Sequence, residues 1–135
     1  MLTRTALKAW LAGLFVLLVA NGGWLVLLQI HKVSVLTLCL YQISPIIVAF
    51  LVSYYSPRNK FLLGLSMAIP VAALCVLVNP ICELFGFAVD SYGIGGQFII
   101  LLITIPYDIA LCALGAWLGF YLDRHSRPKY REQTR

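Results

Sequence analysis

Charged residues are scarce in this chain of 135 residues: Asp, Glu, Lys and Arg together make up 11% of it. Ordinary soluble domains carry about 25% charged residues. Hydrophobic residues, in contrast, make up 61% of the chain. This balance excludes an ordinary water-soluble domain and favours a chain that lies almost wholly in a membrane.

The chain also lacks the short motifs that mark common enzymes. It has no serine nucleophile elbow, no phosphate-binding loop and no HExxH zinc motif. Its four cysteines form no C-x-x-C pair, which argues against thiol–disulfide exchange. His31 and His125 should lie at opposite membrane faces, so a bis-histidine haem site is not expected. We therefore expect a protein that is not an enzyme, with neither a metal site nor a cofactor.

Long apolar runs take the place of these motifs. Four runs fill most of the sequence, at about 6–30, 33–55, 61–87 and 98–122. Each has at least the roughly 20 residues that a helix needs to cross about 30 Å of hydrocarbon. Their continuity favours helices over the short alternating strands of a membrane barrel. The sequence thus predicts an all-α membrane protein, a four-transmembrane-helix bundle over residues 1–123, followed by a basic cytoplasmic tail over 124–135.

Basic residues predict the orientation of the bundle. Lys32 falls on one side, and the other nine of the ten Lys and Arg residues fall on the opposite side: Arg4, Lys8, Arg58, Lys60, Arg124, Arg127, Lys129, Arg131 and Arg135. Basic loops stay in the cytoplasm during insertion. Both termini are therefore expected in the cytoplasm, with the segments around Lys32 and Asp90 outside.

The first run has an alternative interpretation as a cleavable signal. Arg4 and Lys8 precede an apolar stretch, and Ala20-Asn21-Gly22 has the small-x-small pattern of a cleavage site. The run continues to Ile30, however, and so exceeds the roughly 7–15 residues of a signal core. An uncleaved span is the expectation, and cleavage would leave three spans.

Small residues recur at helical spacing within the runs. Lipid tails do not drive helices together, so close backbone approach at small residues must do so. Gly13, Gly64, Gly115 and Gly119 are the positions predicted to pack against other helices. Pro45, Pro70, Pro80 and Pro106 fall inside the runs, where each removes a helix hydrogen bond and can kink the helix.

Each run also carries one polar side chain at a similar depth. Counted from the outer boundary, these residues lie roughly 12–15 Å inward at 1.5 Å per residue, and they are Asn21, Gln42, Asn79 and Asp108. Together they predict a single polar layer, which is a candidate intramembrane ion site.

Asp108 is the most informative residue of this layer. A carboxylate at mid-membrane costs at least about 2.5–3.5 kcal/mol and normally faces the bundle interior or a water-filled cavity. Three roles are open. It can hydrogen-bond Asn79 or Gln42 as interhelical glue, bind a proton or cation for transport, or pair with a basic residue of another protein.

The basic tail predicts contact with the lipid bilayer rather than with nucleic acid. Lysine and arginine near an anionic membrane surface each gain about 1 kcal/mol. The residues expected to contact headgroups are Arg124, Arg127, Lys129 and Arg131.

Two classes of function remain for such a chain. The first is a non-catalytic subunit, assembly factor or regulatory partner of a larger membrane protein, which the small-residue faces favour. The second is a small homo-oligomeric transporter that uses the carboxyl group of Asp108 for ion coupling. We expect the plasma membrane, that is the bacterial inner membrane, in either case.

Overall fold

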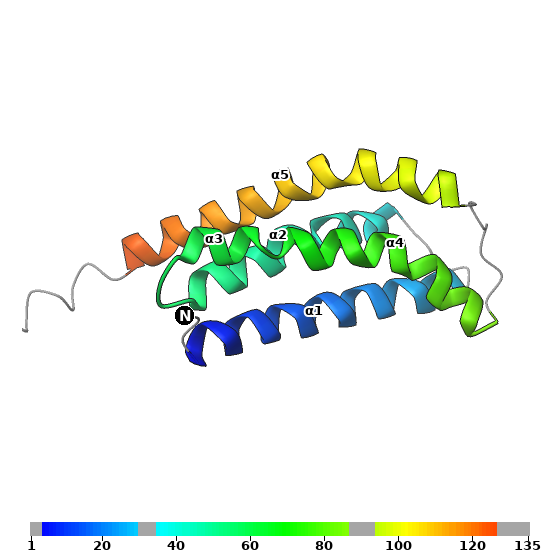
Figure 1. The fold of residues 1–135 in the computed structure, drawn as a ribbon. Helices are drawn as coiled ribbons and strands as arrows, with labels where there is room; N and C mark the ends of the chain where they lie inside the picture. The colour runs from blue at the N-terminus through cyan, green and yellow to red at the C-terminus, as the bar shows by residue number, and fades with distance from the viewer. Residues whose placement is uncertain (1–3, 30–34, 87–93, 127–135) are drawn as a thin grey trace, which may run out of the picture.

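The computed structural model describes residues 4–29, 35–86 and 94–126, apart from the side chains at 25–29, 36–38, 40, 41, 78, 79, 82, 94 and 97. This part of the chain is helical and contains no strand. Its elements, in chain order, are α1 (Arg4–Gln29), α2 (Val35–Tyr55), α3 (Lys60–Leu65), α4 (Ala68–Leu84) and α5 (Ile94–Ser126) (Figure 1).

Within the described residues, three helical segments are long and apolar enough to cross a membrane. They are Arg4–Trp24, Lys60–Leu77 and Phe98–Ser126, and a shorter apolar segment, Gln42–Tyr55, lies within α2. With 33 residues, α5 measures about 50 Å at 1.5 Å per residue and exceeds the hydrocarbon thickness. The architecture is therefore a helical bundle with three candidate membrane spans.

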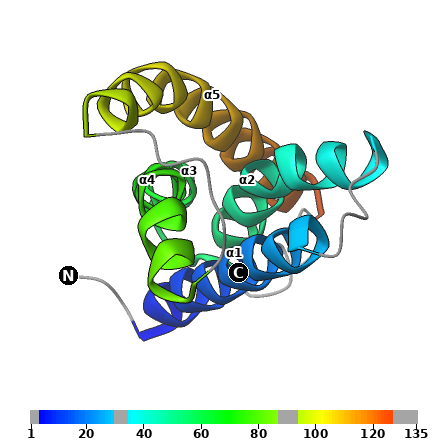
Figure 2. The ribbon, with the colours of Figure 1, turned by 90° about the vertical axis from the view of Figure 1, so that its right-hand side faces the viewer.

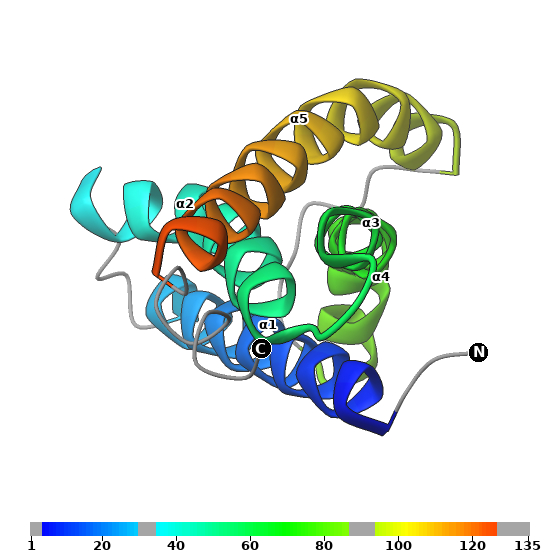
Figure 3. The same ribbon diagram turned by 90° about the vertical axis from the view of Figure 1, so that its left-hand side faces the viewer.

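The helices run side by side along the length of the molecule, with α3 and α4 following one another along one rod (Figures 1 and 2). Seen from the opposite end, α2 lies between α1 and α5, as its extensive contacts with both helices require (Figure 3). Buried apolar side chains of α1, α2, α4 and α5 meet between the rods, among them Leu17, Val48, Val52 and Cys112. Met67, between α3 and α4, completes this core.

Glycine contacts hold α2, α3 and α5 close together toward one end of the bundle. A Cβ atom on Gly115 would overlap the carbonyl oxygen of Ile46, and one on Gly119 would lie 2.6 Å from the carbonyl oxygen of Phe50. A Cβ atom on Gly64 would meet Ala116 Cβ at 2.7 Å. Real side chains do not tolerate these separations, so the three backbones approach this closely only because the positions are glycine.

The third apolar run forms two helices rather than one continuous helix. Pro70 has no N–H to donate to the carbonyl of Ser66, four residues earlier, and that carbonyl accepts from Ile69 instead at 3.2 Å. The Ser66 hydroxyl donates to the carbonyl of Leu63 at 2.7 Å, and the Met67 N–H turns to Gly64 at 3.2 Å. Together these bonds replace the regular backbone hydrogen bonds of an α-helix and separate α3 from α4.

One ion pair joins two helices at the end of the bundle where α3 begins. Lys60 Nζ lies 2.7 Å from Asp123 Oδ2 on α5, and both side chains are largely buried. The turn before α3 is closed by Asn59 in the left-handed region (φ 50°), which asparagine tolerates better than most residues. The same end holds the start of α1, the end of α2 and the end of α5 (Figure 1).

Candidate functional site

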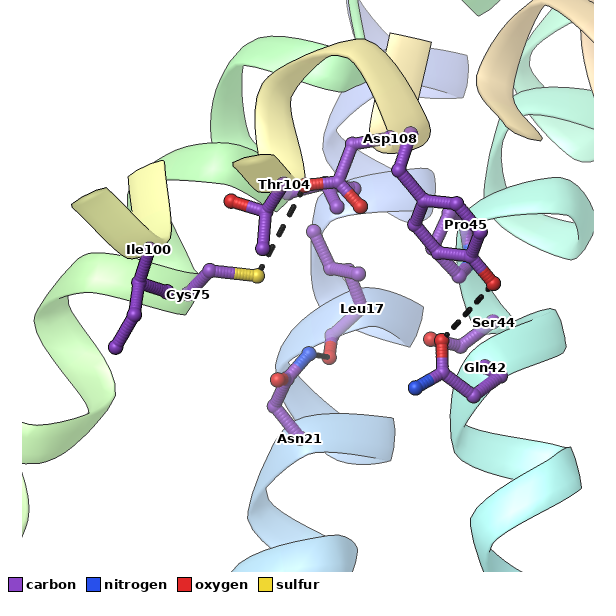
Figure 4. A pocket seen from close by; sticks show the side chains of 11 residues that line it. Leu17, Asn21, Gln42, Ser44, Pro45, Cys75, Ile100, Thr104 and Asp108 are labelled. Atoms are coloured by element: carbon purple, nitrogen blue, oxygen red, sulfur yellow. Dashed lines mark hydrogen bonds between the residues drawn. The ribbon is translucent and has the colours of Figure 1, made fainter. Parts of the chain in front are cut away.

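A cavity of about 330 Å³ lies between α1, α2, α4 and α5, beyond the glycine contacts. It is partly enclosed by these helices and open on one side. Its walls combine apolar and polar side chains (Figure 4), and the polar ones include Asn21, Gln42, Ser44, Cys75, Thr104 and Asp108. Each comes from a helix whose own spacing turns the residue inward, as Thr104, Asp108 and Cys112 do along α5.

Asp108 supplies the carboxyl group of the cavity wall, and this residue is 5% exposed. The thiol of Cys75 on α4 donates to Oδ2 across 3.9 Å, which is a weak hydrogen bond. No lysine, arginine or histidine is among the described side chains that line the cavity. Within the described chain, the carboxyl group therefore has a sulfur neighbour but no cationic partner.

Asn21 and Thr104 both turn their donors toward their own helices. Asn21 Nδ2 donates to the carbonyl of Leu17 at 2.9 Å, and the Thr104 hydroxyl donates to the carbonyl of Leu101 at 3.4 Å. An amide retains its oxygen as an acceptor, and a hydroxyl retains two lone pairs. Asn21 Oδ1 and the lone pairs of Thr104 Oγ1 therefore remain available to accept hydrogen bonds from a ligand in the cavity.

Gln42 and Tyr107 form a bridge between α2 and α5 at the exposed side of the cavity. The Tyr107 hydroxyl donates to Gln42 Oε1 at 3.2 Å (Figure 4). Both residues are exposed. The bond fixes the position of the glutamine amide on α2, the helix that packs against α1 and its Asn21.

The structure brings three of the four residues of the expected polar layer to this one cavity: Asn21, Gln42 and Asp108. The side chain of Asn79 lies outside the described residues. Asn21 and Gln42 do not hydrogen-bond Asp108, although the polar layer had suggested this for Gln42; their partners are the Leu17 carbonyl and Tyr107.

Among the positions expected to pack helices, Gly13 lies against Val52 and Val48 of α2, and Gly64, Gly115 and Gly119 make the contacts described above. Arg124 is exposed at the end of α5. Arg127, Lys129 and Arg131, the other residues expected to contact headgroups, lie outside the described residues.

Four polar cavity residues were not singled out as site residues from sequence: Ser44, Cys75, Thr104 and Tyr107. Thr104 stands four residues before Asp108 and Cys75 four residues before Asn79, so helical spacing could have found both. Tyr107 had no such signal, because it neighbours Asp108 in sequence and reaches Gln42 only through the packing of α5 on α2.

The arrangement is suited to binding. A lone carboxyl group in a polar cavity can take up either a proton or a cation.

Comparison with known proteins identifies no relative: no family model, no curated protein and no solved structure matches the chain.

Proposed function

We propose that this protein is a small ion-coupled transporter of the bacterial inner membrane, acting as a homo-oligomer, with Asp108 as its coupling residue. The observation that carries the proposal is the buried carboxyl group of Asp108 on the wall of a partly open, 330 Å³ cavity whose described lining holds no basic side chain. A carboxyl group in such a place can exchange a proton for a cation. The proposed protein is not an enzyme and uses neither a metal nor a cofactor.

The proposal includes four crossings with both termini in the cytoplasm and one transmembrane domain over residues 1–123. The basic residues at the start of α1, at the α2–α3 turn and at the end of α5 support this topology, because these three places lie at the same end of the bundle (Figure 1). Basic residues remain on the cytoplasmic side during insertion. Arg4, Arg58 and Arg124 then face the cytoplasm, and the cavity lies nearer the outer surface.

Glycine packing favours transport over the role of a partner subunit. Small-residue faces suggested a larger membrane protein as partner, since such faces let helices associate closely. Gly13, Gly64, Gly115 and Gly119 instead lie against helices of this same chain. Their close contacts explain the fold of the chain, so they no longer require a larger partner.

A second candidate function, that of a non-catalytic subunit or regulatory partner, is favoured by one feature of α1. Gly22 and Gly23 are exposed, and a Cβ atom at either would meet nothing within 4 Å. Two adjacent small residues on a free helix surface allow another helix to approach. Purification from native membranes in mild detergent separates the two candidates: a stoichiometric larger protein supports the subunit, and a self-association supports the transporter.

Reconstitution into liposomes that contain a pH-sensitive dye tests the transporter directly. Chloride salts of sodium, potassium, tetramethylammonium and methylguanidinium are added outside, and the internal pH is followed. We expect at least one cation to drive proton movement in the wild-type protein and in Glu83→Gln, a matched carboxyl-to-amide change at an exposed position of α4. Asp108→Asn should be inserted and folded but inactive, because an amide cannot exchange a proton. Proton movement that is absent with every salt, or unchanged in Asp108→Asn, would refute the proposal.

A further inference from the structure

The hydrogen-bonding groups of the cavity are unevenly divided between donors and acceptors. Asn21 Nδ2, the Thr104 hydroxyl and the Tyr107 hydroxyl all donate to groups of the protein itself. The two hydroxyl protons are therefore engaged, and so is one of the two N–H groups of the Asn21 amide, whereas Asn21 Oδ1 and the lone pairs of Thr104 Oγ1 can still accept.

Three polar groups in the wall can still donate, and the first is the second N–H group of the Asn21 amide. Gln42 keeps its amide nitrogen after Oε1 accepts from Tyr107, and the hydroxyl of Ser44 can act as donor or acceptor. Against them stands the carboxyl group of Asp108, which accepts only a weak bond from Cys75. When Asp108 is ionised, the described wall thus offers one negative charge and several acceptor oxygens with no cationic side chain to neutralise that charge, the complement of a cation that carries its own N–H donors.

From this division we infer that the cavity binds a small organic cation with N–H donors, an alkylammonium or alkylguanidinium ion. The inference rests on the proposed function of the same cavity and names its substrate class. An anion would meet the charge of Asp108 without a compensating cation, and a neutral solute would leave that charge unpaired.

Apolar walls and size point to an organic ion rather than to a bare metal ion. Leu17, Val71 and Ile100 line the cavity beside the polar groups and provide surface for an alkyl body. Divalent metal ions require several oxygen ligands at 2.0–2.6 Å. The described residues contain no group of three or more His, Cys, Asp or Glu side chains that could hold such an ion. At about 330 Å³ the cavity is at the small end of the range of ligand pockets, which begins at about 300 Å³.

Binding of the cation competes with a proton for Asp108. When the carboxyl group is protonated, the organic cation replaces that proton: the O–H bond breaks, the proton leaves to solvent, and an N–H donor of the cation takes its place on the carboxylate. The other titratable side chains around Asp108 in the described chain are Cys75 on α4 and Cys112 and Tyr107 on α5, while α1 and α2 contribute neutral Asn21, Gln42 and Ser44. We therefore expect the affinity for the cation to rise with pH, by up to about tenfold per unit while Asp108 is protonated.

Ligand-induced stabilisation of the purified full-length protein tests the inference without a transport assay. The midpoint of thermal unfolding is measured in detergent against millimolar methylguanidinium chloride, because a ligand that binds the folded state raises the midpoint. Two matched probes isolate the two requirements: methylurea has the same shape without the charge, and tetramethylammonium has the charge without N–H donors. Sodium chloride controls for ionic strength. We expect methylguanidinium to bind at least about tenfold more tightly than either matched probe.

Variants then locate the binding. Asp108→Asn should abolish stabilisation by methylguanidinium, and Glu83→Gln should retain it. Should Asp108→Asn fail to fold, Thr104→Val keeps the carboxyl group and removes one acceptor, and it should weaken binding severalfold. Equal stabilisation by methylurea or tetramethylammonium, stabilisation by sodium chloride alone, or full binding in a folded Asp108→Asn or Thr104→Val protein would overturn the inference.

Failure of the inference and failure of the transport proposal give different results. If sodium or potassium drives proton movement through Asp108 and methylguanidinium does not bind, the chain is a transporter and the substrate class is wrong. If methylguanidinium binds through Asp108 and no salt drives proton movement, the substrate class holds and the cavity is a binding site without transport.

Discussion

Gly115 lies where α5 crosses α2, and its missing side chain sets the distance between the two helices. A Cβ atom there would overlap the carbonyl oxygen of Ile46 and approach two more backbone atoms of that residue. Backbone atoms cannot turn aside as a flexible side chain can. The helix pair would have to separate, and Gly119, one turn further, would lose its contact with Phe50.

Alanine substitution should therefore be costly at one glycine and harmless at another. Gly115→Ala is expected to destabilise the fold by about 1–3 kcal/mol, the usual cost of overpacking. Gly22→Ala, where a Cβ atom meets nothing within 4 Å, should be neutral or stabilising by up to about 1 kcal/mol, since alanine has the higher helix propensity. Unfolding of both variants in detergent, by denaturant titration, measures the difference. Equal stability of the two would mean that α5 does not pack on α2 at this position.

At the scale of elements, the break between α3 and α4 is held by a side chain from a third helix. The indole Nε1 of Trp10 on α1 donates to Ser66 Oγ at 3.1 Å, while that same hydroxyl donates to the Leu63 carbonyl. Pro70 accounts for the missing backbone bond, and Trp10 ties the interrupted rod to α1. The break is thus a point of attachment between helices that are far apart in sequence.

A double-mutant cycle measures this attachment. Trp10→Phe and Ser66→Ala each remove one partner of the bond, and the double variant removes both. We expect a coupling free energy of about 0.6 kcal/mol, the average for hydrogen bonds between membrane helices, and no more than about 1.7 kcal/mol. Trp10→Phe combined with Ser53→Ala, whose hydroxyl bonds Ala116 instead, serves as the control cycle and should show additive effects. If the Trp10–Ser66 cycle shows no coupling free energy, or no more than the control cycle, this hydrogen bond does not attach α1 to the break between α3 and α4.

The molecule as a whole has close helix contacts toward the end where α1 begins, and the cavity lies toward the other end. Glycine contacts and the Lys60–Asp123 ion pair close the end at which α1 begins and α5 finishes. The cavity with Asp108 lies beyond them. In the proposed topology, the closed end faces the cytoplasm and the cavity is nearer the outside.

Accessibility labelling tests that topology over the whole chain. Single cysteines are placed at positions 32, 58, 90 and 131 in a background without the four native cysteines, and intact cells are treated with a membrane-impermeant reagent. Positions 32 and 90 should react in intact cells, and positions 58 and 131 only after the membrane is permeabilised. Reaction of position 58 from outside would reverse the orientation, and reaction of position 32 only from inside would reduce the number of crossings.

The helical character of this chain and its long apolar helices could be predicted from the sequence. Low charge and long apolar runs favour membrane helices, because an apolar segment of that length gains most when it leaves water and bonds its own backbone. Helical spacing also related Asp108 to Gly115 and Gly119 on one face of α5, and all three are buried. These are local properties, set by residues within a few turns of one another.

Which helix faces meet, and where the bundle encloses a cavity, depends on the packing of the helices and could not be predicted from the sequence. Lipid tails are as apolar as leucine, so hydrophobicity does not distinguish a residue that faces lipid from one that faces another helix. The Tyr107–Gln42 bond, the Trp10–Ser66 bond and the enclosure of Asp108 by four helices join residues more than thirty positions apart or on separate rods. They depend on how the helices pack, and that packing is settled by close backbone contacts such as Gly115 on Ile46 rather than by any pattern within one helix.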